Sequence, residues 1–458
     1  MIAVERSTFL PSPPDLVYRW HTRPGAFERL VPPWESVDLL EAHPGIANGT
    51  RARFTIRKGP FRFTWIAEHR DVEPGRQFRD VQIEGPFARW NHLHRFEPAG
   101  DGGTKMTDRI ELAAPGGGLG QAVAGNSLQR TVEQTLAYRH ATVAADLALH
   151  QRLGVGPQTI AITGATGFIG RALSPLLTTG GHRVVRLVRR DPKPGDVLWD
   201  PAADRLDPRS LEGVDAIVHL AGESIAGGRW TEEKKRRVID SRSRGTSLLA
   251  RTLAQMDRPP AVLVCASAIG FYGDRGEDEM AEGSPRGKGF LADVVSAWEE
   301  SSAPARAAGV RTVSTRFGLV LSPRGGGLAP MLIPFRLGLG GRLGDGNQWV
   351  SWIGIDDVIG IVATALFDQR LEGPVNAVAP WPERNRDFTA KLGRVLHRPT
   401  VLAVPGVVLR AALGAFAQEG LLASTRVRPE ALLTTGYRFR YPELEPALRH
   451  LLGQELSG

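Results

Sequence analysis

The chain has 458 residues, of which 42% are hydrophobic and 23% are charged, so it can bury several cores and we expect about two to four domains. A single cysteine, Cys265, excludes a disulfide framework and indicates a reducing compartment. The formal net charge is +8, but the arginines are spread along the whole chain instead of forming one basic patch, so we expect no nucleic-acid partner.

Neither of the two segments that could direct the chain to a membrane has the required composition. The first residues, "MIAVERSTFLPSPPD", contain an early acid and several prolines but no apolar core of a signal peptide. The longest apolar stretch, residues 401–423, is interrupted by Pro405, Arg410 and Glu419, which predicts a core-facing helix and no membrane span. We therefore expect a cytoplasmic protein.

Residues 1–150 predict one strand, two short helices, a run of antiparallel strands and one long helix. From Thr50 onward apolar residues alternate with arginines and other polar residues, and Gly, Pro and Asp turns separate the repeats. The last helix carries an apolar stripe made of Leu128, Val132, Leu136, Val143 and Leu147. A curved sheet wrapped around such a helix leaves an apolar cavity, so we predict that this domain binds an apolar small molecule.

This order of elements, with "HTRPGAFERLVPPWESVDLLE" and "GPFARWNHLHRFEP", resembles the SRPBCC superfamily of START-like ligand-binding proteins. The resemblance implies an α+β helix-grip domain. His92 and His94 alternate onto one strand face, as metal ligands can, but no third ligand is suggested nearby. We interpret both as ordinary sheet residues and predict no metal.

A short glycine-containing linker at residues 151–157 separates this domain from a different pattern. Over residues 158–395, continuous Val/Ile runs alternate with helical segments, which is typical of parallel strands covered on both faces. The sequence thus predicts an α/β Rossmann-like, doubly wound parallel sheet.

The first strand of this sheet leads into "TGATGFIG", residues 163–170, and a helix follows. Glycines at such a turn let the backbone approach a pyrophosphate, whose charge the helix N-terminus stabilises. The loop is similar to that of extended short-chain dehydrogenase/reductases, so we predict cofactor contacts at Gly164, Thr166, Gly167, Phe168, Ile169 and Gly170. The resemblance extends these contacts to the turn after a later strand, at Leu220, Ala221 and Gly222.

The end of the second strand selects between the two nicotinamide dinucleotides. An acid there binds the ribose 2′-hydroxyl of NAD, whereas an arginine accommodates the 2′-phosphate of NADP. Here the strand ends in Arg189 and Arg190, so we predict NADP (NADPH). The alternative is that both are solvated arginines in an arginine-rich chain.

The catalytic residues of ordinary short-chain reductases do not follow the loop. Those enzymes use a Tyr with a Lys four residues later, and none of the five tyrosines has that partner. The remaining candidates are Tyr272, as a proton donor after the strand that carries Ser267, and Ser267 itself. Tyr272 could equally pack its ring at a strand end, and a further candidate, Glu223, could cap the next helix.

The phrases "LAGESIAGGRW", "SAIGFYGDRG", "RFGLVLSPRGGGLAPML" and "WIGIDDV" closely resemble an epimerase-like family of atypical extended short-chain reductases. The resemblance implies a cofactor contact at Arg242, and Gly354 replaces a histidine that is usual in the family. Residues 396–458 resemble the small helical domain of unknown function attached to that family. The resemblance of the whole segment from residue 158 onward implies an oxidoreductase or epimerase of unknown small-molecule substrate. The alternative is a non-catalytic NADP-dependent redox or ligand sensor.

Overall fold

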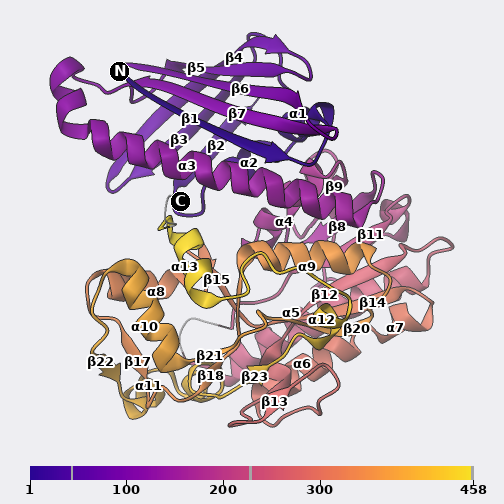
Figure 1. Cartoon of the computed structure of the whole chain (residues 1–458). Helices are drawn as coiled ribbons and strands as arrows, with labels where there is room; N and C mark the ends of the chain where they lie inside the picture. Colours follow the sequence, from indigo (N-terminus) through magenta and orange to yellow (C-terminus); the bar gives the residue numbers. More distant parts are fainter. Residues whose placement is uncertain (43–44, 226–228, 455–458) are drawn as a thin grey trace. The chain divides into compact units, whose positions relative to one another are not determined.

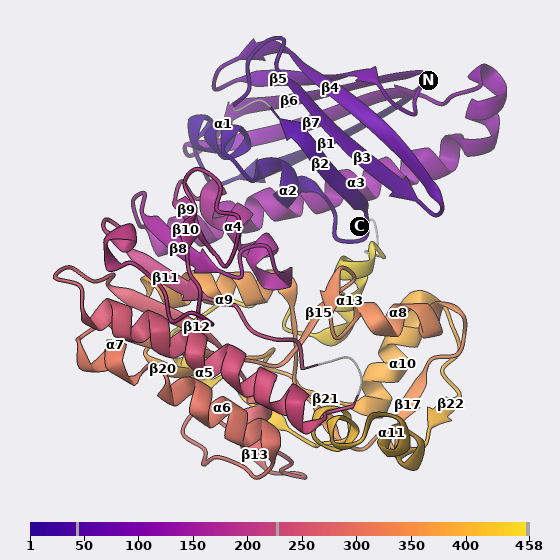
Figure 2. The same cartoon turned by 180° about the vertical axis from the view of Figure 1, so that it is seen from behind.

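The computed structural model describes residues 1–42, 45–225 and 229–454 (Figures 1 and 2). The chain forms two compact units, one centred on residues 1–154 and the other on residues 155–177 and 182–451. Within the described residues, no helix is long and apolar enough to cross a membrane.

The N-terminal unit is a seven-stranded antiparallel sheet with a long helix across one face (Figure 1). The strand order is β1-β7-β6-β5-β4-β3-β2. Its strands are β1 (Ile2–Leu10), β2 (Ser36–Ala42), β3 (Arg51–Lys58), β4 (Phe61–Glu73), β5 (Gln77–Glu84), β6 (Arg89–Ala99) and β7 (Gly103–Ala113). Its helices are α1 (Pro14–Thr22), α2 (Ala26–Leu30) and α3 (Gly117–Leu153). This is the helix-grip arrangement that the sequence predicted.

The period-two pattern of the strands explains how the sheet packs against α3. Val132, Leu136, Val143 and Leu147 of the predicted stripe are buried. They belong to two apolar clusters, one with Phe78, Phe96 and Met106 and the other with Ile110 and Leu112. On the opposite face, charged side chains of β1, β5, β6 and β7 predominate in a shallow groove.

The second unit is built on a seven-stranded parallel sheet of order β10-β9-β8-β11-β12-β14-β20. Its strands are β8 (Thr159–Thr163), β9 (Arg183–Val188), β10 (Val197–Leu198), β11 (Ala216–His219), β12 (Val262–Ala268), β14 (Arg311–Phe317) and β20 (Gly373–Ala377). Helices α4 (Phe168–Thr179) and α9 (Ile355–Phe367) cover one face, and α5 (Glu232–Ala254), α6 (Phe290–Glu300) and α7 (Ala303–Ala307) cover the other (Figures 1 and 2). The predicted doubly wound fold is confirmed.

Smaller elements complete this unit. They are η1 (Pro208–Leu211), η2 (Ile269–Tyr272), β13 (Glu279–Met280), β15 (Leu319–Ser322), β16 (Gly325–Gly326), α8 (Ala329–Arg336), β17 (Gly341–Leu343), β18 (Trp349–Val350), β19 (Trp352–Gly354), β21 (Glu383–Arg384), α10 (Asn385–Leu396), β22 (Leu402–Val404), α11 (Gly406–Leu413), η3 (Ala417–Leu421), β23 (Arg426–Val427), α12 (Glu430–Thr434) and α13 (Leu444–Leu452).

The core-facing helix predicted over residues 401–423 is wrong. The segment is divided into β22, α11 and the single turn η3, and none of the residues of α11 is buried. Pro405 precedes α11, and Gly414 ends it with a positive φ of 61°. These two residues divide the apolar stretch into pieces too short to build a buried helix.

Candidate functional site

The glycine loop after β8 has a backbone that only glycine fits at two positions. Gly164 has a φ of 69°, and a Cβ atom there would lie 3.0 Å from the backbone nitrogen of Ala221. A Cβ atom at Gly170 would overlap the carbonyl oxygen of Gly164 and lie 2.7 Å from Ala165 Cα. The loop is thus packed tightly on its inner side, while Thr166 and Gly167 at its tip are exposed.

The loop lies where the winding direction of the sheet reverses. From β8 the chain proceeds to β9 and β10 on one side, and β11, β12, β14 and β20 follow on the other. Ligands of open parallel sheets bind at such a switch point, outside the carboxyl ends of the strands. The first turn of α4 begins here with Phe168 and Ile169, both half-buried, so its backbone N–H groups can receive a phosphate.

The neighbouring turn after β11 is held in place by a threonine–histidine pair. The Thr163 hydroxyl accepts hydrogen bonds from the N–H groups of Leu220 and Ala221, both at 3.2 Å. The same hydroxyl lies 2.7 Å from His219 Nδ1. Burial lowers the pKa of His219 to about 3, so its imidazole is neutral at physiological pH and can accept the hydroxyl proton. The sequence reasoning did not identify this pair.

Phe168 has a packing role beside the loop. Its ring lies against the hairpin of β15 and β16, where a Cβ atom at Gly325 would be 2.6 Å from Phe168 Cδ2. Gly326, with a φ of 63°, also faces this ring. The triple glycine of this segment therefore lets the hairpin approach the start of α4.

Arg189 and Arg190 directly follow β9, which pairs with β8 in parallel register. Both side chains are exposed, at the same edge of the sheet as the glycine loop. Two solvent-accessible guanidinium groups at this position are suited to a 2′-phosphate. The role of these residues stays a prediction.

Arg242 of α5 lies beside the turn after β11. A Cβ atom at Gly222 would be 3.6 Å from Arg242 Cζ, which places the guanidinium against this turn. Arg242 donates a hydrogen bond to the Val238 carbonyl at 3.1 Å, and its Cζ lies 4.9 Å from the ring centroid of Trp298. Burial lowers the pKa of Arg242 to about 10, which still leaves it charged at neutral pH, with Glu223 favouring the charge.

The candidate catalytic residues are occupied by contacts within the protein. Tyr272 is fully buried, and its hydroxyl donates to Asn376 Oδ1 at 2.7 Å and accepts from Arg316 Nη1 at 2.9 Å. Burial raises the pKa of the Tyr272 phenol, an effect that Arg316 opposes. Ser267 is also buried and donates to Glu299 Oε1 at 2.6 Å. Catalysis by either residue stays a prediction, and both have structural roles.

These contacts form one polar row across the sheet. Ser267, Arg316 and Asn376 are in register on the adjacent strands β12, β14 and β20. Arg316 binds both carboxylate oxygens of Glu299, at 2.8 and 2.7 Å. A signal was available in the sequence, because each of the three is a polar residue at the next-to-last position of its strand.

Glu223 does not cap α5. The N-cap is Thr231, whose side chain accepts from the N–H of Lys234. Glu223 is exposed, and its backbone N–H donates to Ser241 Oγ at 3.0 Å. The predicted capping role is therefore wrong, because α5 begins further along the chain than the sequence pattern indicated.

Two histidines of β6 belong to a buried cluster of ionisable side chains, and the prediction that they bind no metal stays a prediction. His92 and His94 are buried on the inner face around Asp108, which also lies 2.7 Å from Nε2 of His140 on α3. Asp80 on the neighbouring strand β5 joins them, so a third ligand-type side chain is present after all. Although burial acts to raise it, the pKa of Asp108 is held well below its usual range by the His94 charge and by hydrogen bonds from the imidazoles.

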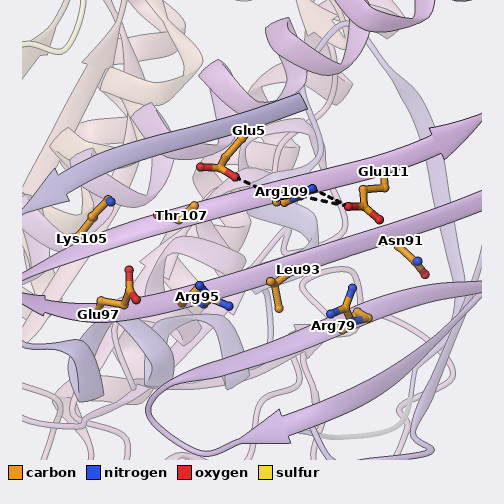
Figure 3. A pocket seen from close by; sticks show the side chains of 10 residues that line it. All are labelled: Glu5, Arg79, Asn91, Leu93, Arg95, Glu97, Lys105, Thr107, Arg109 and Glu111. Atoms are coloured by element: carbon orange, nitrogen blue, oxygen red, sulfur yellow. Dashed lines mark hydrogen bonds and ion pairs between the residues drawn. The ribbon is translucent and has the colours of Figure 1, made fainter. Parts of the chain in front are cut away.

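A separate groove of about 270 Å³ lies on the opposite, polar face of the same sheet (Figure 3). Charged side chains from β1, β5, β6 and β7 dominate its lining, among them Arg79, Arg95, Lys105, Arg109 and Glu111. This groove is therefore not the apolar cavity that the sequence predicted beneath α3.

Three family descriptions match successive parts of the chain. Residues 10–139 match the polyketide cyclase/dehydrase and lipid transport family, residues 160–377 the NAD dependent epimerase/dehydratase family, and residues 404–451 a domain of unknown function. An epimerase family protein from Mycobacterium bovis is 42% identical over 290 residues, which cover 63% of this chain and 96% of that protein. The chain belongs to the epimerase family.

One solved structure extends the similarity to both units, and a second covers about two thirds of the chain. A structure described as the nucleoside-diphosphate sugar epimerase from Corynebacterium glutamicum is 35% identical with a TM-score of 0.82, covering 99% of this chain and 90% of that chain. The human epimerase family protein SDR39U1, solved with NADPH, is 35% identical with a TM-score of 0.59, covering 64% of this chain and 99% of that chain. The family and fold resemblances predicted from the sequence are confirmed.

Proposed function

We propose that this epimerase-family protein binds NADPH at the glycine loop and acts as an oxidoreductase or epimerase on a small molecule. The observation that carries the proposal is the joint position of two features at one edge of the parallel sheet. The glycine loop accepts no Cβ atom at Gly164 or Gly170, and Arg189 and Arg190 are exposed at the end of the adjacent strand. The NADPH in the human relative supports the same cofactor.

In this proposal, different residues bind different parts of the cofactor. Amides of the loop and of the start of α4 bind the pyrophosphate, and Arg189 and Arg190 bind the 2′-phosphate. Arg242 supplies a positive charge beside the Leu220–Gly222 turn. When bound, NADPH supplies a hydride for an electrophilic carbon of the substrate.

The cofactor assignment is tested by isothermal titration of the Arg189→Ala/Arg190→Ala protein with NADPH and NADH. Each charge-assisted hydrogen bond contributes about 1.5–3 kcal/mol, so NADPH affinity should fall at least about tenfold while NADH affinity stays unchanged. Arg183→Ala is the matched control, because Arg183 is exposed at the opposite end of the same strand. Equal losses in the double variant and in the control would contradict the assignment.

A second candidate function, a non-catalytic NADPH-dependent redox or ligand sensor, is favoured by the buried state of Tyr272. Its hydroxyl already donates to Asn376 and accepts from Arg316, and no lysine follows four residues later. A phenol in this state is a poor proton donor to a substrate. Incubating the protein and NADPH with a panel of carbonyl compounds and nucleoside-diphosphate sugars separates the two functions. Oxidation of NADPH or conversion of any of these compounds supports an enzyme, whereas NADPH binding without conversion of any compound supports a sensor.

For the N-terminal domain, we propose binding of an apolar small molecule on the inner face of the sheet beneath α3. Two observations support this proposal: the match to a lipid transport family, and the apolar residues that both the sheet and α3 contribute to this face. Native mass spectrometry of the full chain and displacement of a fluorescent fatty acid test it. Absence of any bound molecule in both measurements would contradict it.

A further inference from the structure

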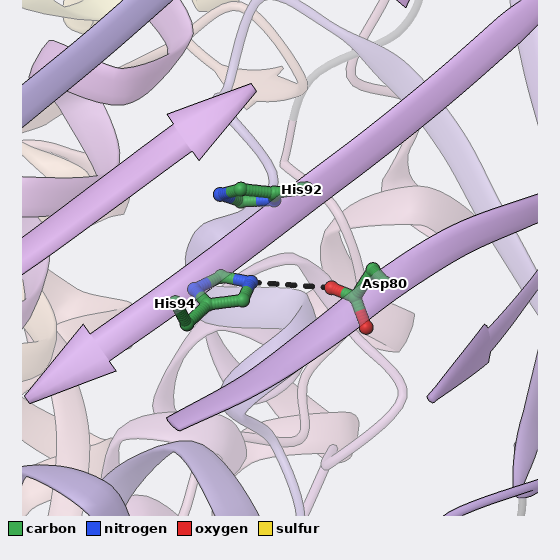
Figure 4. A group of neighbouring side chains, drawn as sticks. All are labelled: Asp80, His92 and His94. Carbon is green, nitrogen blue, oxygen red and sulfur yellow. Dashed lines mark hydrogen bonds and ion pairs between the residues drawn. The ribbon is translucent and has the colours of Figure 1, made fainter. Parts of the chain in front are cut away.

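Three side chains with metal-ligand chemistry meet on the inner face of the N-terminal sheet (Figure 4). Asp80 on β5 lies directly opposite His92 on β6, and His94 is two residues further along the same strand. Each offers one ligand atom, and the three atoms lie within 4.8 Å of one another. Carboxylate oxygen and imidazole nitrogen are both zinc ligands, so the donor set is chemically suited to that ion.

Asp108 orients both imidazoles from the side opposite Asp80. His92 Nε2 lies 2.9 Å from Asp108 Oδ1, and His94 Nδ1 lies 2.5 Å from the same oxygen. Metal-binding histidines almost always direct their second ring nitrogen to a carboxylate, a carbonyl or water. The contacts with Asp108 therefore leave His92 Nδ1 and His94 Nε2 as the nitrogens for an ion.

The spacing on the Asp80 side fits a tetrahedral site. His94 Nε2 lies 3.2 Å from Asp80 Oδ2, as Figure 4 shows. Zinc bonds of about 2.0 Å place two tetrahedral ligands about 3.3 Å apart, so an ion can replace the proton between these two atoms, which is released to solvent, with little movement of either atom. The other carboxylate oxygen of Asp80 lies 2.6 Å from His69 Nδ1, which fixes the orientation of the carboxylate.

The cluster also has a route to solvent. The Asp80 side chain is 24% exposed, whereas those of His94 and His92 are 5% and 2% exposed. An ion can therefore enter past Asp80 and be held by the buried imidazoles.

We propose that the N-terminal domain binds a Zn²⁺-class divalent ion through Asp80 Oδ2, His92 Nδ1 and His94 Nε2, with Asp108 and His69 as orienting partners. Three protein ligands leave one position of a tetrahedral ion open, as in zinc sites that bind an exchangeable group. That position suits a water molecule or an oxygen of a small molecule bound beneath α3.

The test uses the full chain without a histidine tag, treated with a chelator and titrated with ZnCl₂. We expect one tightly bound equivalent, and Co²⁺ in place of Zn²⁺ should give the intense visible bands of a tetrahedral site. Asp80→Asn preserves the shape of a partly exposed residue and should weaken Zn²⁺ binding about a hundredfold, with circular dichroism confirming the fold.

His397→Ala, at an exposed histidine of the other unit, is the control and should bind Zn²⁺ as the wild type does. Octahedral Co²⁺ spectra, less than one tight equivalent in the wild type, or unchanged affinity in folded Asp80→Asn would each overturn the proposal. The Co²⁺ spectrum of the wild type keeps the test decisive if the Asp80 variant fails to fold.

Discussion

Replacing Tyr272 by phenylalanine tests whether the hydroxyl of this residue holds the carboxyl edge of the parallel sheet together. The hydroxyl joins Asn376, which is fully buried, to Arg316, which is 3% exposed. Removing it leaves one acceptor and one charged donor without this partner, each at a cost of about 1–3 kcal/mol. Because Arg316 retains its two bonds to Glu299, we expect a total near the lower end, about 3 kcal/mol.

Differential scanning calorimetry of the full chain measures the effect. About 1 kcal/mol shifts the Tm of a domain of this size by about 2–4 °C, so the transition of the nucleotide-binding unit should fall by about 6–12 °C. Tyr18→Phe is the control, because no hydrogen-bond partner of the Tyr18 hydroxyl lies among the described residues, and its transitions should stay within about 2 °C. A shift equally small in Tyr272→Phe would refute the structural role assigned to the hydroxyl.

Three further predictions concern other buried positions. The pKa of His219 is lowered to about 3, so below pH 6.5 this imidazole takes up a proton only in the unfolded chain, and the free energy of unfolding should fall by about 2 kcal/mol between pH 7 and pH 5. Urea unfolding of His219→Asn at these two pH values should lack this part of the decrease. Burial raises the pKa of the Cys265 thiol to about 12, so iodoacetamide at about pH 8 should label the native chain negligibly and the unfolded chain once. Mass spectrometry measures the labelling, and rapid labelling of the native chain would contradict the prediction. Gly170→Ala should lower NADPH affinity at least about tenfold, because the added Cβ displaces the loop that receives the pyrophosphate. Gly283→Ala is the control: a Cβ atom there meets nothing within 4 Å, so this variant should bind NADPH as the wild type does in the same titration.

Periodicity in the sequence was sufficient to predict both folds, because strand alternation and buried Val/Ile runs are local signals. The stripe from Leu128 to Leu147 and the glycine loop are examples, since each depends on neighbours in the chain. Contacts between distant strands were not predictable in this way: Tyr272 meets Asn376 across 104 positions. Likewise, Asp80 and Asp108 join the two histidines of β6 only through the register of three strands. The helix prediction over residues 401–423 failed because hydrophobicity alone does not show which apolar side chains become buried in the fold.

We infer that the glycine loop and the arginines after β9 together bind NADPH in preference to NADH. Calorimetric titration of the wild-type chain with each dinucleotide under identical salt measures this directly. We expect NADPH to bind at least about tenfold more tightly than NADH, because one or more charge-assisted hydrogen bonds hold its 2′-phosphate. Equal affinity for NADPH and NADH, or no binding of either, would contradict it.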